Sequence, residues 1–115
     1  VYVNGILQSQ GTLRLRSVTI KGNSADRMFL IGKSYDDARW FEGDMAEVRV
    51  WNVVRTQEEI ATHFYSVDPK TPGLVGYWKM DDNTSPNIVK DATGNGNDAK
   101  ANKPLSWHNV SLPEK

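Results

Sequence analysis

The chain has 115 residues, and its 14 lysine and arginine residues balance its 14 aspartate and glutamate residues. A chain of this length can bury one hydrophobic core, and its balanced charge gives no basis for binding nucleic acid or an anionic membrane. Cysteine is absent, which excludes a disulfide scaffold, a thiolate metal site and a cysteine nucleophile.

The first predicted element is a β-hairpin over residues 1–9, in which apolar runs flank the dipeptide Asn4-Gly5. This dipeptide accepts positive φ angles at both central positions of a tight turn. A strand that begins at residue 1 has an edge that can pair with another chain. We therefore expect either a missing N-terminal segment, bound as a separate chain, or edge pairing between copies.

Three antiparallel strands are predicted next, over residues 12–20, 27–32 and 46–51. The first alternates, and a bulge near Arg16 would keep its apolar residues on one face. The second is a short buried strand that ends at Gly32. The third places Ala46, Val48 and Val50 on one face and Glu47, Arg49 and Trp51 on the other. Such alternation is typical of half-buried antiparallel strands.

One helix is predicted over residues 55–64. Thr56 is followed three residues later by Glu59, which is the spacing of a capping box. Ile60 and Phe64 stand four residues apart and would share one face of the helix.

Two further strands are predicted, over residues 74–80 and 104–113, the second closing the sheet with Trp107, Val110 and Leu112. Several short strands, one short helix and no alternation of helices with strands indicate an all-β protein. The fold class predicted is an antiparallel β-sandwich.

The chain resembles the laminin-G-like domains of the concanavalin A-like lectin/glucanase superfamily in five segments that follow in order: VYVNGIL, FLIG, FEGDMAEVRVWNVVRTQEEI, LVGYWKMDD and DATGNGNDA. The form is similar to one found in secreted and surface proteins of Bacteroidetes-type bacteria. The resemblance implies a jelly-roll sandwich in an extracytoplasmic protein. It also implies that residues 1–115 are the C-terminal part of a single domain, incomplete at its N-terminus, because the YVNG hairpin lies mid-domain in that family.

A glycoside hydrolase is one function that the superfamily suggests. Its β-glucanases carry a Glu-x-Asp-x-x-Glu motif, and Glu42, Asp44 and Glu47 have this spacing. In a retaining enzyme one glutamate is the nucleophile and the other the general acid, about 5 Å apart. Gly43 stands where that motif has a branched apolar residue, and the residues that follow match the laminin-G-like strand instead. The alternative is that Glu42 and Asp44 lie in a loop before the strand.

Residues 90–101, KDATGNGNDAKA, are rich in aspartate, asparagine and glycine. They lack the Gly-Lys-Ser/Thr of a phosphate-binding loop and the third glycine of a dinucleotide-binding loop. Laminin-G-like domains often bind calcium through such a loop and an acid on a neighbouring strand. The resemblance therefore implies a Ca²⁺ site with Asp91 and Asn97 as ligands. Ala46 fills the position of the strand acid, so Asp44 is the candidate to replace it.

The alternative for this loop is structural, because aspartate and asparagine side chains also stabilise turns by bonding to nearby backbone groups. In that case Asp91, Asn95 and Asn97 make turns and bind no ion.

Carbohydrate binding needs flat aromatic faces beside polar groups. Tyr35, Trp40 and Phe41 flank a polar loop and are the candidate ligand-binding residues. The leading prediction is a non-catalytic extracytoplasmic recognition module that binds carbohydrate or a surface protein. A glycoside hydrolase and a structural spacer are the alternatives.

Overall fold

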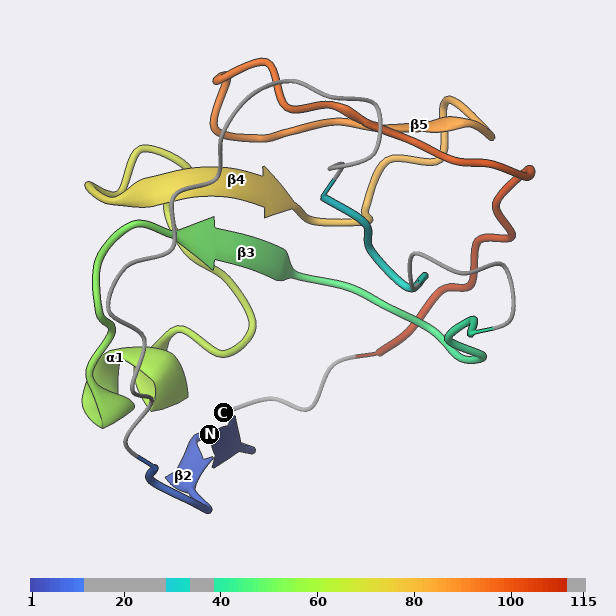
Figure 1. The fold of residues 1–115 in the computed structure, drawn as a ribbon. Helices are drawn as coiled ribbons and strands as arrows, with labels where there is room; N and C mark the ends of the chain where they lie inside the picture. Colours follow the sequence, from blue (N-terminus) through green and yellow to red (C-terminus); the bar gives the residue numbers. More distant parts are fainter. Residues whose placement is uncertain (12–28, 34–38, 112–115) are drawn as a thin grey trace. The chain divides into compact units, whose positions relative to one another are not determined.

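The computed structural model describes residues 1–11, 29–33 and 39–111 (Figure 1). The chain divides into two compact units, one formed by residues 1–10 with 45–115 and the other by residues 11–44. The predicted strand over residues 12–20 lies outside the described residues.

The predicted hairpin is confirmed. Strand β1 (Tyr2–Val3) pairs antiparallel with β2 (Ile6–Leu7). The turn residues Asn4 and Gly5 have φ angles of 53° and 76°, so both central positions are left-handed, as this dipeptide allows. A Cβ atom added at Gly5 would lie 3.0 Å from Cβ of Ala61, so glycine also lets the turn approach the helix closely.

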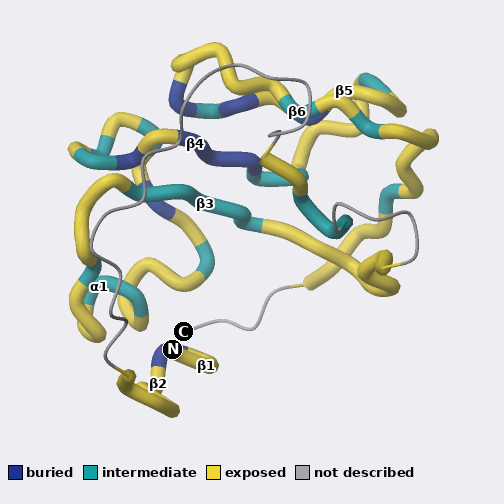
Figure 2. Tube along the Cα trace, in the orientation of Figure 1, coloured by how far each residue is buried: buried dark blue, intermediate teal, exposed yellow. Residues whose placement is uncertain are grey.

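The main ladder joins β3 (Val48–Trp51) to β4 (Leu74–Trp78) in antiparallel register, from Val48 opposite Trp78 to Val50 opposite Gly76. The register shifts between Val50 and Trp51. All four residues of β3 are half-buried, so the predicted contrast between its two faces is absent. Strand β4 carries most of the burial in this ladder (Figure 2).

The predicted strand over residues 46–51 begins two residues late, at Val48. Glu47 has a φ of 57°, which is outside the extended region that a strand requires. Its backbone N–H still donates to the carbonyl of Lys79 at 3.2 Å, so the two chains stay adjacent where the ladder ends.

The hydrophobic core gathers around β4. It consists of Val67, Leu74 and Tyr77, with Trp51 and Ala92 packed against them. Tyr77 is fully buried, at 0% exposure. Trp51 comes from β3, and Ala92 comes from residues 90–98, which we call the Asp/Asn-rich loop. Burial of these side chains therefore packs the Asp/Asn-rich loop against the main ladder.

The predicted helix forms as α1 (Gln57–Thr62), shorter than residues 55–64. Its capping box is confirmed: the Glu59 N–H donates to Oγ1 of Thr56 at 3.2 Å, and the Thr56 N–H donates to Oε2 of Glu59 at 2.8 Å. The helix ends before Phe64, so the expected pairing of Ile60 and Phe64 along one helix face is wrong.

Two strands form where the sequence predicts only turns. Strand β5 (Ile88–Val89) pairs antiparallel with β6 (Ala99–Lys100), and residues 90–98 connect them. The segment KDATGNGNDAKA is therefore the long loop of a short hairpin together with its second strand.

Two predicted strands are wrong within the described residues. At residues 29–32 the chain forms no strand, and Phe29 is 65% exposed rather than buried. Residues 104–111 form no closing strand either, and Val110 is 66% exposed. Leu105 donates to the carbonyl of Pro86, but no paired ladder develops along either stretch of the described chain, so apolar residues alone do not produce a strand.

The fold class is as predicted: the described strands pair antiparallel in three two-stranded sheets, accompanied by one short helix. Within the part of the chain that the structure describes, no helix has the length and apolarity needed to span a bilayer.

Candidate functional site

The candidate sugar-binding residues belong to the unit formed by residues 11–44. An isolated antiparallel bridge pairs Lys33 with Trp40, and the Phe41 N–H donates to the Gly32 carbonyl at 2.9 Å. These contacts bring residues 32–33 next to residues 40–41, on either side of residues 34–38 in the sequence. Tyr35 lies in that connection, outside the described residues.

Two consecutive aromatic rings follow the bridge. Trp40 is 50% exposed and Phe41 is 53% exposed. The Lys33 ammonium lies 4.7 Å from the centroid of the Trp40 ring, within cation–π range. An accessible ring beside a hydrogen-bond donor is what a sugar requires, because its apolar face stacks on the ring while its hydroxyl groups bond to the polar neighbour.

Gly43 determines how Phe41 is placed. Its φ is 149°, and a Cβ atom there would lie 3.0 Å from Cζ of Phe41. The phenyl ring therefore lies against the backbone of Gly43. The φ angle of Gly43 is one that residues with a side chain rarely adopt. A branched apolar residue, as the glucanase motif has at this position, would be strained here.

The three acids of the hydrolase alternative do not share a strand. Residues 42–47 precede β3 and have no strand structure, so strand alternation cannot place Glu42, Asp44 and Glu47 on one face. Glu42 and Asp44 are exposed, as expected for a loop before the strand.

Glu47 is bound to other side chains of its own unit. The Tyr77 hydroxyl donates to Oε2 of Glu47 at 2.5 Å, and Arg49 forms an ion pair with the same oxygen. Arg49 also donates to the His63 carbonyl at 2.6 Å and lies 5.0 Å from the Tyr77 ring centroid. Burial raises the pKa of Tyr77, and its hydrogen bond to Glu47 raises it further. Glu47 therefore anchors a buried tyrosine.

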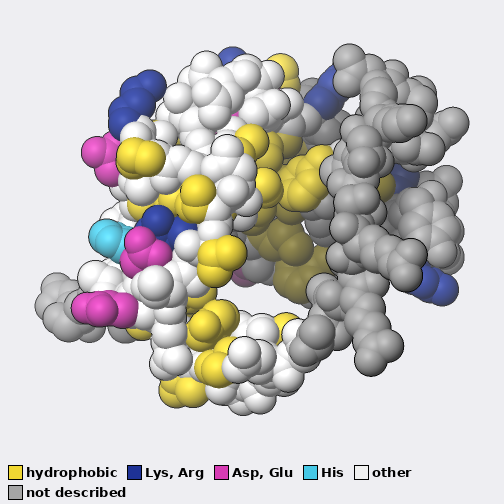
Figure 3. All heavy atoms as spheres, turned by 60° about the vertical axis from the view of Figure 1, so that its left-hand side comes forward, with side chains coloured by type: hydrophobic (Ala, Val, Ile, Leu, Met, Phe, Trp, Pro, Cys, Tyr) yellow, Lys and Arg dark blue, Asp and Glu magenta, His cyan; other side chains and the backbone are white. Residues whose placement is uncertain are grey.

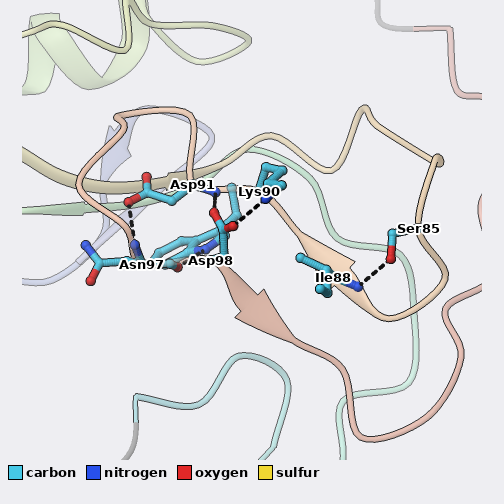
Figure 4. A network of polar contacts seen from close by, with 7 residues as sticks. Ser85, Ile88, Lys90, Asp91, Asn97 and Asp98 are labelled. Carbon is cyan, nitrogen blue, oxygen red and sulfur yellow. Dashed lines mark hydrogen bonds and ion pairs between the residues drawn. The ribbon is translucent and has the colours of Figure 1, made fainter.

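The Asp/Asn-rich loop is organised by Asp91, which is 7% exposed (Figure 4). Its Oδ1 accepts hydrogen bonds from the Tyr77 N–H at 3.1 Å, the Thr93 N–H at 3.1 Å and the Thr93 hydroxyl at 2.7 Å. Its Oδ2 accepts one from the Asn97 N–H at 3.2 Å. Burial raises the pKa of Asp91, but these hydrogen bonds outweigh it and hold the pKa below its usual value.

Asn97 and Asp98 close the loop from its other end. The Asn97 carbonyl accepts from Nε1 of Trp78 at 2.9 Å, and its side-chain amide donates to the Val75 carbonyl at 3.2 Å. Asp98 accepts the Asp91 N–H at 2.9 Å through Oδ1, and its Oδ2 lies 2.7 Å from the Lys90 ammonium. Asp98 is a structural residue that the sequence analysis did not single out.

These contacts do not fit Asp91 as a calcium ligand. Calcium takes six to eight oxygen ligands, whereas Oδ1 of Asp91 already accepts three hydrogen bonds and its Oδ2 accepts the Asn97 N–H. Asp44 is exposed, in the loop that precedes β3. Among the residues described, no three histidine, cysteine, aspartate or glutamate side chains gather as a metal site. The Ca²⁺ site remains a prediction that no contact of this loop favours.

Comparison with known proteins identifies the family. A family model for the concanavalin A-like lectin/glucanases superfamily, in its laminin-G form, matches residues 1–61. A candidate carbohydrate-binding protein from Bacteroides ovatus ATCC 8483, known from a crystal structure, is 36% identical, with a TM-score of 0.45. The alignment covers 59% of this chain and 22% of that protein. No curated protein matched the chain. The chain belongs to the concanavalin A-like lectin/glucanase superfamily.

Proposed function

We propose that this chain is a non-catalytic recognition module that binds carbohydrate through Trp40 and Phe41. The superfamily to which it belongs comprises lectins and glucanases, so carbohydrate is the ligand class that family membership favours. Tyr35 is a third candidate contact by its position in the sequence.

The observation that carries the proposal is the exposure of two adjacent aromatic rings, 50% for Trp40 and 53% for Phe41. Large aromatic side chains are usually buried, so two exposed rings side by side in the sequence need an explanation. The Lys33 ammonium, 4.7 Å from the Trp40 ring, adds a donor for sugar hydroxyl groups.

Support for a non-catalytic role comes from Glu47. A glycosidase needs two carboxyl groups that face the scissile bond. The carboxylate of Glu47 is bound instead to Arg49 and to the Tyr77 hydroxyl. A function has to be argued from site geometry rather than from the fold, and this geometry favours binding over hydrolysis.

Glycan-array binding by the wild type, Trp40→Ala and Phe41→Ala tests the proposal. We expect the wild type to bind at least one glycan and each substitution to weaken that binding by about 2- to 12-fold, since stacking on an aromatic ring contributes about 0.5–1.5 kcal/mol. Phe64→Ala is the matched control, because Phe64 is also an exposed aromatic residue, at 43%, outside this unit.

Two results would contradict the proposal. One is glycan binding of equal strength by the wild type, Trp40→Ala, Phe41→Ala and the control Phe64→Ala. The other is release of reducing sugar from a β-glucan that Glu42→Gln abolishes, because this result would establish the hydrolase instead. If the chain neither binds a glycan nor hydrolyses a β-glucan, the remaining alternative is the structural spacer.

We further propose that the module acts outside the cytoplasm, at the cell surface, in secreted form or in the periplasm, where a glycan or a surface protein would be its partner. Fractionation of cells that express the protein at natural levels tests this placement. Recovery with cytoplasmic markers only would contradict it.

A further inference from the structure

Two lysine side chains contact groups of the Asp/Asn-rich loop, residues 90–98. Lys90 is the first residue of this loop, and Lys70 comes from an earlier part of the chain. The Lys90 ammonium lies 2.7 Å from Oδ2 of Asp98 (Figure 4). The Lys70 ammonium donates to the Thr93 carbonyl at 3.3 Å. One lysine thus contacts a carboxylate of the loop and the other contacts a backbone carbonyl.

These acceptors belong to the groups that bind a hard cation, since calcium is held in proteins by carboxylates, amide oxygens and backbone carbonyls. An ammonium group is a compact positive charge with three donors, so it can bond to the same oxygen types. The remaining carboxylate of the loop, Asp91, is surrounded by donors from Tyr77, Thr93 and Asn97.

We propose that the Lys70 and Lys90 ammonium groups, together with the donors around Asp91, supply the positive charge that calcium would supply to such a loop. The loop then closes without a metal ion. The two aspartates Asp91 and Asp98 are balanced by two lysines, so the cluster is formally neutral.

The charge balance gives a reason why an added divalent ion is not favoured. A calcium ion at these oxygens would face two ammonium groups, and like charges at short range repel. It would also have to displace the N–H and hydroxyl donors from Oδ1 of Asp91, which are paired and largely buried. Asp98 has a lowered pKa and Lys90 a raised pKa, each chiefly because of the hydrogen bond between them, as expected for an intact ion pair.

The test is thermal unfolding of the whole 115-residue chain, followed by circular dichroism in excess calcium chloride and in excess EDTA. We expect the same Tm in both. A ligand that binds only the folded state stabilises it by RT ln(1 + [L]/Kd), so excess calcium at an occupied site would raise Tm. A clear rise with calcium that Asp91→Ala abolishes would overturn the proposal.

A second measurement tests the lysines themselves. The double variant Lys70→Met, Lys90→Met should lower Tm by a few degrees, because the loop loses both positive groups. The double variant Lys100→Met, Lys103→Met removes the same charge from two other lysines, which are exposed like Lys70 and Lys90, and should leave Tm nearly unchanged.

Charge retention separates an electrostatic role from simple packing. Lys90→Arg should keep the ion pair with Asp98 and keep Tm close to that of the wild type, whereas Lys90→Met should not. Equal Tm values for the two lysine double variants would overturn the proposal even if calcium has no effect on the wild type.

Discussion

At the scale of single residues, the carboxylate of Asp91 joins three parts of the chain. It bonds to β4 through the Tyr77 N–H, to its own turn through Thr93, and to the far end of the loop through the Asn97 N–H. Tyr77 and Thr93 are buried with it, so loss of the carboxylate would leave their donors without a partner in a place that water reaches poorly.

Asp91→Ala should therefore lower the free energy of unfolding by about 2–4 kcal/mol, because several buried donors lose their charged acceptor. Chemical denaturation measures this change. Asp81→Ala is the control, since Asp81 is exposed, and its effect should stay within about 0.5 kcal/mol. Equal effects of the two substitutions would contradict the structural role of Asp91.

The pH dependence of stability follows from the same residue. Burial raises the pKa of Asp91, but its hydrogen bonds lower it more, so the folded-state pKa lies below the ordinary value of 3.8. A carboxyl group with a lowered folded-state pKa contributes stability that is present above the unfolded-state pKa and is lost as the pH falls through the folded-state pKa. We expect Tm to fall as the pH is lowered below about 4.

Asp91→Asn should flatten that fall, because the substituted residue no longer titrates. It should not abolish the fall, since Asp98 also has a lowered pKa through its bonds to Lys90 and the Asp91 N–H. Thermal unfolding between neutral and acidic pH checks both statements. An unchanged slope in Asp91→Asn would show that other groups control the acid transition.

At the scale of elements, the sequence predicted best those turns and helix ends whose signal lies within a few neighbouring residues. The Asn4-Gly5 turn and the Thr56/Glu59 capping box form as expected because each depends on residues a few positions apart. Strands need a partner elsewhere in the chain, which is why residues 29–32 and 104–111 have apolar residues and no strand. Strands β5 and β6 are joined by residues 90–98 rather than by a two-residue turn, so no local hairpin signal marked them.

Gly76 tests the β3–β4 ladder as an element. A Cβ atom there would lie 2.6 Å from Cη2 of Trp78, whose Nε1 is held by the Asn97 carbonyl at 2.9 Å. Gly76→Ala should therefore destabilise the protein by about 1–3 kcal/mol through overpacking.

Gly11→Ala is the matched control, because its added methyl group would meet no atom of the described residues within 4 Å. Urea denaturation of both variants makes the comparison. If Gly76→Ala is as stable as Gly11→Ala, the contact between the indole ring and the Gly76 backbone is not a constraint on the ladder.

At the scale of the whole molecule, the family was predictable from sequence because its motifs follow one another in order along the chain. The candidate site was predictable only in part. The exposure of Trp40 and Phe41 depends on the three-dimensional structure. The contacts of Glu47 with Arg49 and Tyr77 depend on the pairing of β3 with β4. The Ca²⁺ site with Asp44, Asp91 and Asn97 stays a prediction, because residue spacing does not determine which groups of the loop donate hydrogen bonds to Asp91.

Hydrophobic side chains also reach the surface of the described residues (Figure 3). In the unit that contains the hairpin, Val3 is 51% exposed and Ile6 is 60% exposed. The prediction of edge pairing between copies concerns these strands. Size-exclusion chromatography with light scattering tests pairing between copies: a mass above the monomer that Ile6→Lys reduces would support it, and a monomer at high concentration would contradict it.

The most direct test of the central claim is a calorimetric titration of the wild type and Trp40→Ala with the glycan that binds best on the array. We predict saturable binding to the wild type and an affinity about 2- to 12-fold weaker for Trp40→Ala, with Phe64→Ala equal to the wild type. Equal affinities for the wild type and Trp40→Ala would contradict the claim that this exposed ring is the carbohydrate-binding surface.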